Sequence, residues 1–260
     1  MFSESTIARS RRFRGLKALP LLVALALSAN PAAAGVVVVG SGSNLLTGSG
    51  QIELGCGDME IAGSLSGEVT GARNINFTAG AALTGAVLSL SGDWINNGPQ
   101  ALDAIVDWRD GCGVTASNML GSSDLPALNI TSESGREVRF EANAEQRIVN
   151  SLGLTGTPDT RLRLRSTDPM LYAGLTLDFG ASQLIDSVDV ARIDSSAGQS
   201  IAPGDPADYN SVRAGPVRNW FTLPPIPIPT LGLVSSSLLV LIMILIGLFH
   251  QRQRPTNFPE

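Results

Sequence analysis

The sequence predicts an all-β chain, most of it a right-handed parallel β-solenoid, with a signal peptide before it and one transmembrane helix after it. Three observations predict this arrangement. The 260 residues are 43% hydrophobic but only 5% aromatic, and they include 28 glycines. Short segments with period-two alternation recur through the middle of the chain. Both ends carry apolar runs flanked by basic residues, which are typical of export and membrane insertion.

Residues 1–34 have the pattern of a secretory signal peptide. Their basic part holds Arg9, Arg11, Arg12, Arg14 and Lys17. The apolar run that follows is about ten residues long, too short to cross a bilayer that needs about 20. Small residues then place the expected cleavage site between Ala34 and Gly35. General export is the default expectation, and Ser10-Arg11-Arg12 leaves the twin-arginine route as an alternative.

Residues 35–221 are expected to form the exported β-rich domain. No stretch in them shows a long helical stripe, whereas alternating segments occur at 51–54, 74–77, 87–91, 137–141, 161–165 and 175–179. Arg161, Arg163 and Arg165 are expected to point to one face of a strand, and Leu162 and Leu164 to the other.

Two architectures fit many short strands with glycine turns: a β-solenoid and a β-sandwich. We favour the solenoid because the pieces are only three to five residues long. Small-residue segments such as 63–67 and 78–85 separate them as corners. Coils of roughly 20–25 residues would number about eight. Trp220 ends the last strand-like piece and is expected to close the stack, while Trp94 and Trp108 are expected to be buried rather than to stack on sugars.

Two segments resemble bacterial surface β-helix proteins of the filamentous haemagglutinin and adhesin type. Residues 91–98, SGDWINNG, are similar to a phrase common in those proteins, and residues 185–201 are similar to their C-terminal coils. The resemblance implies a β-helix that binds or builds surfaces and is not an enzyme.

Cys56 and Cys112 are the only cysteines, and an exported location favours a disulfide between them. Strictly stacked positions two and a half coils apart would lie about 10 Å or more from each other, whereas bridged Cα atoms lie within about 7 Å. We therefore expect residues 96–126, which have the poorest strand signal, to leave the stack and fold back. Residues 101–108 are expected to form one or two helical turns there.

Composition excludes several kinds of chemistry from the body. The only histidine is His250 and the only lysine is Lys17, so His-dependent triads, His-ligated metals and Schiff-base lysines are excluded. Residues 35–230 hold 11 arginines and 21 acidic residues, a net charge of −10, which argues against nucleic-acid binding.

Two groups of acidic residues offer alternatives to a passive surface. Asp103, Asp107 and Asp110 could bind Ca²⁺ if they cluster, although no calcium-loop motif is present. The second group could act on polysaccharides if paired in a groove, and it comprises Asp186, Asp189, Asp194, Asp205 and Asp208. We expect no enzyme activity, no metal and no cofactor. Carboxylates gathered in one groove with Arg or Trp opposite would favour the enzyme.

The C-terminal part is predicted to form a stalk, a membrane helix and a tail. Residues 222–230 are rich in proline and are expected to be stiff and extended. Residues 231–249 form an uncharged apolar run whose helix would span roughly 28 Å, close to the hydrocarbon thickness. Arg252 and Arg254 follow within residues 250–260, so the tail is expected to be cytoplasmic and the body exported.

Ile228, Pro229, Thr230 and Leu231, followed by an apolar helix and arginines, resemble the IPTL-CTERM sorting signal. The resemblance implies cleavage by an exosortase-like membrane protease and covers about the last 35 residues. The family usually has Trp-Gly where this chain has Val234 and Ser235, which leaves a plain membrane anchor as the alternative.

Together these observations predict an exported bacterial envelope protein with a structural or adhesive role. It is expected in the cytoplasmic membrane with its body in the periplasm, and at the cell surface or outside after sorting. A polysaccharide or matrix component is a candidate partner. A polysaccharide-active β-helix hydrolase or lyase is the alternative.

Overall fold

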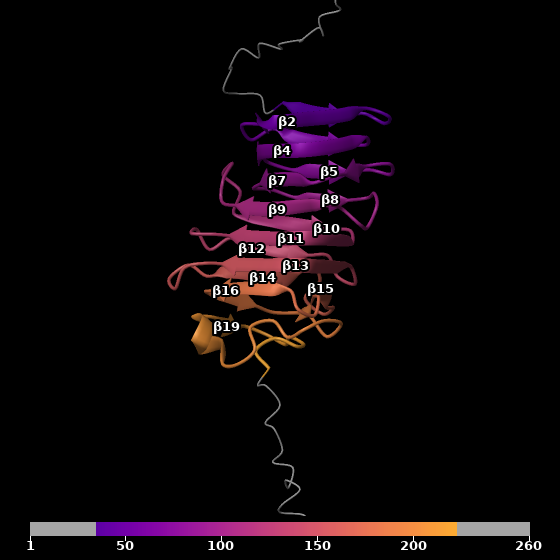
Figure 1. Cartoon of the computed structure of the whole chain (residues 1–260). Coiled ribbons are helices and arrows are strands. Elements are labelled where there is room, and N and C mark those ends of the chain that lie inside the picture. Colours follow the sequence, from indigo (N-terminus) through magenta and orange to yellow (C-terminus); the bar gives the residue numbers. More distant parts are fainter. Residues whose placement is uncertain (1–34, 223–260) are drawn as a thin grey trace, which may run out of the picture. The chain divides into compact units, whose positions relative to one another are not determined.

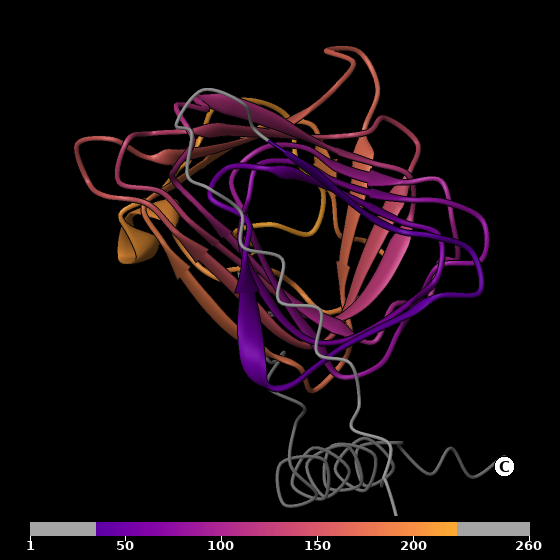
Figure 2. The ribbon, with the colours of Figure 1, turned by 90° about the horizontal axis from the view of Figure 1, so that it is seen from above.

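A computed structural model describes residues 35–222, which form a parallel β-solenoid of about eight coils. The strands stack in chain order from the first coil to the last (Figure 1). Seen along the stack, the coils outline a three-sided ring whose interior is filled by side chains (Figure 2). The solenoid expectation is thus confirmed, and the sandwich alternative is wrong because every strand pairs in parallel with the coil above or below.

One side of the solenoid, face 1, is a nine-stranded sheet. Its strands in order are β1 (Val36–Val39), β3 (Asp58–Ile61), β5 (Ile75–Phe77), β8 (Trp94–Asn96), β10 (Ala116–Leu120), β12 (Glu137–Phe140), β14 (Leu162–Ser166), β17 (Val188–Val190) and β19 (Val212–Arg213).

The other two sides belong to one bent sheet. Its strands are β2 (Asn44–Glu53), β4 (Ser64–Ala72), β6 (Ala82–Leu83), β7 (Ala86–Leu90), β9 (Ala104–Arg109), β11 (Ser123–Thr131), β13 (Glu145–Thr155), β15 (Ala173–Leu177), β16 (Ser182–Asp186) and β18 (Ile193–Asp194). The long strands turn a corner midway: the first half of β13 pairs with β15 and its second half with β16. We call the side that carries β6, β15 and β18 face 2, and the side that carries β7, β9 and β16 face 3.

Each alternating segment of the sequence overlaps a strand, and most of its apolar residues point inward; Phe179, just after β15, is an exposed exception. Leu162 and Leu164 are fully buried and Arg163 is exposed, as expected from the period of two. The corners expected at 63–67 and 78–85 are only partly right, because β4 and β6 run through them on face 2.

Equivalent inward positions stack from coil to coil. On face 1 the register places five large buried side chains in one column: Met59, Ile75, Trp94, Met119 and Phe140. Burying each such side chain contributes about 1.5–3 kcal/mol, so the column is a main source of stability.

The three tryptophans are buried, as expected. Trp94 packs on Phe77 with ring centroids 4.5 Å apart, and Trp108 is fully buried on face 3. Trp220 is 2% exposed on the last coil, where it bridges to Ile201 and packs against Phe221. It therefore closes the core at this end, beside the 3₁₀ helix η1 (Pro206–Tyr209).

The disulfide is present, but the expected excursion is not. Cys56 and Cys112 are bonded with Cα atoms 5.5 Å apart. Residues 96–126 nevertheless stay in the stack as β9, β10 and the start of β11, and residues 101–108 contain no helix. The reason is that Ala104, Val106 and Trp108 alternate inward, which suits a strand.

The two cysteines are bonded although the strands before them are not neighbours in the sheet. Cys56 lies in the turn after β2 and Cys112 in the turn after β9, three strand positions apart in one sheet. Both have left-handed backbones, with φ of 69° and 51°. The Cys56 amide donates to the Gly71 carbonyl of β4 at 2.7 Å, and Gly111 lies beside Ser91, which follows β7, so each turn lies against an intervening coil.

One charged side chain is fully buried within the stack. The Arg136 guanidinium has no exposed surface; its Nε lies 3.4 Å from Asp110 Oδ1 and its Nη2 donates to the Val114 carbonyl at 3.2 Å. Asp110 Oδ2 in turn accepts from the Ser132 hydroxyl and from the amides of Glu133 and Ser134. This Asp110–Arg136 brace joins corners of successive coils.

The N-terminal leader, most of the proline-rich segment, the sorting motif, the apolar run at 231–249 and the basic tail lie outside the described residues. Within residues 35–222, no helix has the length and apolar character needed to cross a membrane.

Candidate functional site

The first group of acidic residues does not gather. Asp103 accepts from the Gly85 amide at 2.8 Å, Asp107 accepts from the Asn129 amide group at 2.9 Å, and Asp110 belongs to the Asp110–Arg136 brace. In the described part of the chain, no three His, Cys, Asp or Glu side chains are grouped to hold a metal ion. The gathering that the calcium alternative requires is therefore not seen for these three residues.

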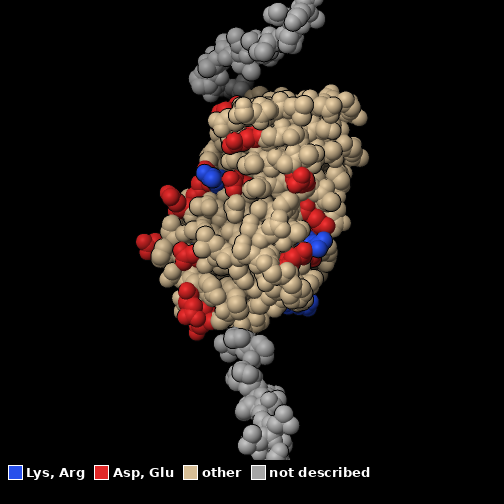
Figure 3. Space-filling view, in the orientation of Figure 1, with Lys and Arg blue, Asp and Glu red and all other residues tan. Residues whose placement is uncertain are grey.

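The second group is also dispersed over the last coils. Its members have separate surroundings: Asp186 accepts from Asn210, Asp189 pairs with Arg165, Asp205 caps η1, Asp208 lies within η1, and Asp194 pairs with Arg218. Acidic side chains are scattered in the same way over the face seen in Figure 3. Two of them line hollows that hold a second carboxyl group: Asp189 shares a small one of about 300 Å³ with Asp159, and Asp194 shares a larger one with Glu145.

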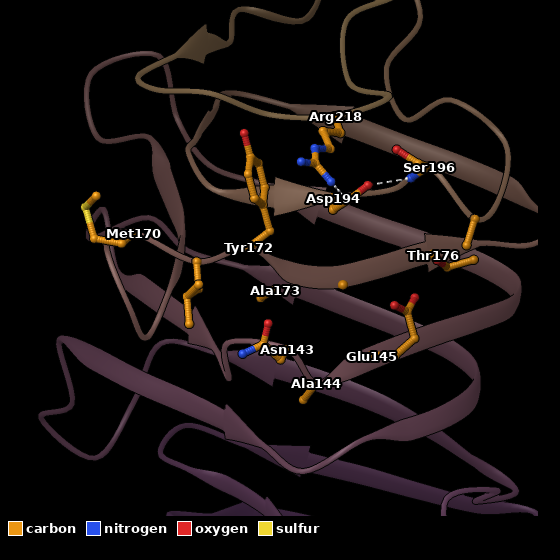
Figure 4. A pocket seen from close by; sticks show the side chains of 13 residues that line it. Asn143, Ala144, Glu145, Met170, Tyr172, Ala173, Thr176, Asp194, Ser196 and Arg218 are labelled. Atoms are coloured by element: carbon orange, nitrogen blue, oxygen red, sulfur yellow. Dashed lines mark hydrogen bonds and ion pairs between the residues drawn. The ribbon is translucent and has the colours of Figure 1, made fainter.

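The larger hollow lies on face 2 of the last coils and has a volume of about 580 Å³. Figure 4 shows the side chains around it, which come from β13, β15 and β18, from the loop before β15 and from the chain after β18. The polar ones are Glu145, Tyr172, Thr176, Asp194, Ser196 and Arg218. A neighbouring hollow of about 620 Å³ shares Glu145 and Thr176 and reaches Phe179. We call the two together the face 2 groove.

The register explains why two carboxyl groups meet here. Glu145 pairs with Gly174, Gly174 with Asp194, and Asp194 with Arg218, so the four form one outward column on successive coils. A Cβ atom at position 174 would collide with Glu145 Oε2. The missing side chain of Gly174 thus creates the space into which the Glu145 carboxyl extends, toward the strand of Asp194 (Figure 4).

Glu145 is the perturbed acid of the groove. Burial raises the pKa of its carboxyl above the usual range; nearby Asp194 and Asp124 raise it further, while the Thr176 hydroxyl and amide oppose the shift. Oε1 is inaccessible and accepts no hydrogen bond. This carboxylate is therefore poorly compensated when it is charged.

Asp194 shows the opposite behaviour. Burial raises its pKa, but hydrogen bonds from Ser196 and the ion pair with Arg218 outweigh burial and hold the pKa below its usual value. Arg218 Nη1 lies 3.0 Å from Asp194 Oδ2, and its guanidinium carbon lies 4.4 Å from the Tyr172 ring centroid. Asp194 therefore stays ionised and anchors Arg218 over the aromatic ring.

No family model, curated protein or solved structure matches this chain. Of the polar residues of the face 2 groove, only Asp194 stands out in the sequence. The others were missed because Glu145, Gly174 and Asp194 are spaced 29 and 20 residues apart, and such unequal coils hide the column.

Glu145→Gln is expected to stabilise the protein at neutral pH. The raised pKa means that the folded state holds this proton more tightly than the unfolded chain does. Ionised Glu145 therefore destabilises the wild-type fold. This destabilisation is absent below the unfolded pKa of about 4.3, grows as the pH rises through the folded pKa, and is constant above it. Denaturant titrations at several pH values should show the variant's advantage shrinking toward pH 4. An advantage that does not change with pH would contradict this account.

Proposed function

We propose that this chain is an exported bacterial envelope protein whose solenoid serves a structural or adhesive role. The observation that carries the proposal is the single uninterrupted stack of parallel coils, which presents long, rigid, polar faces. Cross-coil ion pairs lie on those faces, such as Arg73 with Asp58 at 2.9 Å and Arg165 with Asp189 at 2.9 Å. A disulfide agrees with an oxidising compartment outside the cytoplasm.

The location follows from the two ends of the sequence. We propose that a signal peptide is removed between Ala34 and Gly35 and that the helix at 231–249 holds the body outside the cytoplasmic membrane. Arg252 and Arg254 then remain in the cytoplasm. An exosortase-like protease would cut near the motif at 228–231 and release the body to the surface or the medium.

Mass spectrometry of the native protein from membrane and medium fractions tests this proposal. The expected N-terminus is Gly35, and sorting gives a C-terminus within residues 228–231 with the helix missing. An intact helix in the membrane fraction would replace sorting with a permanent anchor. An uncleaved protein in the cytoplasm would overturn the proposal as a whole.

Catalysis on polysaccharides is the second candidate, and the column through Gly174 favours it. Glu145 and Asp194 are two strands apart, about 9.6 Å between Cα atoms at the usual spacing. Glycosidases pair a protonated acid with an ionised carboxylate, and the opposite pKa shifts of these two residues suit that pairing. Release of reducing ends from envelope polysaccharide, abolished by Glu145→Gln and by Asp194→Asn, would establish an enzyme. Equal release by the wild type and both variants would show that Glu145 and Asp194 are not a catalytic pair.

A further inference from the structure

The charges of the face 2 groove do not balance. Arg147 lies between Asp178 and Asp124, at 2.7 and 3.7 Å, and Arg218 pairs with Asp194. Among residues 35–222, Glu145 forms no ion pair with any arginine, although it sits between these pairs. A partly buried carboxylate without a counter-charge is unfavourable unless it takes up a proton or meets a cation.

The surroundings of Glu145 leave room for that cation. Gly174 offers no side chain beneath the carboxyl, and the hollow opens above it. Thr176 is buried and lines both hollows, and its hydroxyl oxygen is inaccessible. A group with several donors in this hollow could therefore meet the carboxyl groups of Glu145 and Asp194, which both line it.

The donor set points to an ammonium group. Ca²⁺ requires about six to eight oxygen ligands, whereas only one carboxylate here lacks a partner, and the described residues hold no metal-binding group. An ammonium carries one charge and three donors, which suits the free carboxylate of Glu145 beside the paired carboxylate of Asp194.

The walls of the groove indicate what carries the ammonium. Leu171 borders one hollow, and Phe179, which is 82% exposed, borders the other, whereas the Tyr172 ring already carries the Arg218 guanidinium. Aromatic and apolar side chains on an exposed polar face provide surfaces on which sugar rings pack. We infer that the face 2 groove binds a polysaccharide of amino sugars with free amino groups, with the ammonium of one residue held by Glu145. This inference rests on the proposed adhesive function and names its ligand.

Calorimetric titration of the full-length protein in detergent tests this inference with two matched ligands. A glucosamine oligomer carries the ammonium groups, and the N-acetylglucosamine oligomer of equal length lacks them. We expect the glucosamine oligomer to bind at least tenfold more tightly. Glu145→Gln, which keeps the shape and removes the charge, should weaken it about 10- to 100-fold, the usual effect of losing a hydrogen bond to a charged group. Gly174→Ala, which displaces the carboxyl, should weaken binding as well.

The control is Glu68→Gln, which makes the same change at an exposed position on β4, far along the stack. It should leave binding unchanged, whereas equal losses in both variants would indicate bulk charge attraction and overturn the inference. Equal binding of the two oligomers would also overturn it, but would leave an adhesive role for a neutral glycan. If neither oligomer binds but the protein is retained on native envelope polysaccharide, the amino-sugar ligand is wrong and the adhesive function stands. Loss of that retention as well would remove the adhesive function.

Discussion

Asp110→Ala is expected to lower the free energy of unfolding by about 3–5 kcal/mol, the usual cost of leaving a buried charge without its partner. The substitution removes the carboxylate beside the Arg136 guanidinium, which has no exposed surface. It also removes the acceptor for the amides of Glu133 and Ser134 and for the Ser132 hydroxyl. Chemical denaturation of the full-length protein, followed by circular dichroism, measures the change.

A second substitution separates the buried charge from the lost hydrogen bonds. Adding Arg136→Met to Asp110→Ala should restore part of the stability, because no isolated charge then remains inside the stack. Asp159→Ala, in an exposed loop, should change stability by no more than about 0.5 kcal/mol. A loss for Asp110→Ala as small as that of Asp159→Ala would show that the brace contributes little.

The same brace gives a pH dependence. Burial raises the pKa of Asp110, but hydrogen bonds from Ser134, Ser132 and Glu133 outweigh it and hold the pKa below its usual value. The stability that the Asp110 carboxylate contributes is therefore complete above the unfolded pKa of about 3.9, and it is lost as the pH falls through the lower folded pKa. Asp110→Ala should lack this acid-dependent part of the stability curve.

Cys56→Ser is expected to destabilise the protein by about 4 kcal/mol. The disulfide closes a loop across a sequence separation of 56, and opening it frees the unfolded chain. Cys112→Ser should give the same loss, and the double variant should lose no more than either single one. Denaturation with and without reductant measures it, since reductant should lower the stability of the wild type only. If wild-type stability did not respond to reductant, the disulfide would not be formed in the native protein.

The sequence predicts the coil but not how distant coils meet. The alternating segments became strands because each places its apolar residues on one side, as Leu162 and Leu164 do. The predicted excursion at 96–126 failed because it assumed that cysteines can bridge only if they are directly stacked. The missed signal is the tripeptide Gly-Cys-Gly, present at both 55–57 and 111–113, where Gly55 and Gly113 adopt left-handed backbones beside the cysteines.

The groove could be predicted only in part. Asp194 is visible as an acid in a strand-like segment, but its meeting with Glu145 depends on Gly174 lying between them. Coils of unequal length conceal that register until the pairing is known. The burial of the tryptophans could be predicted, since large aromatic side chains in a chain with few of them are expected in the core.

The stapled turns also determine how the protein would respond to force. A chain pulled at its two ends peels one coil at a time from a stack of parallel strands, and each coil lengthens the molecule as it opens. The bond between Cys56 and Cys112 excludes the residues between them from that lengthening. At about 3.5 Å per extended residue, it withholds about 190 Å of extension until it is reduced. Under tension, reducing conditions would therefore make the protein markedly more extensible.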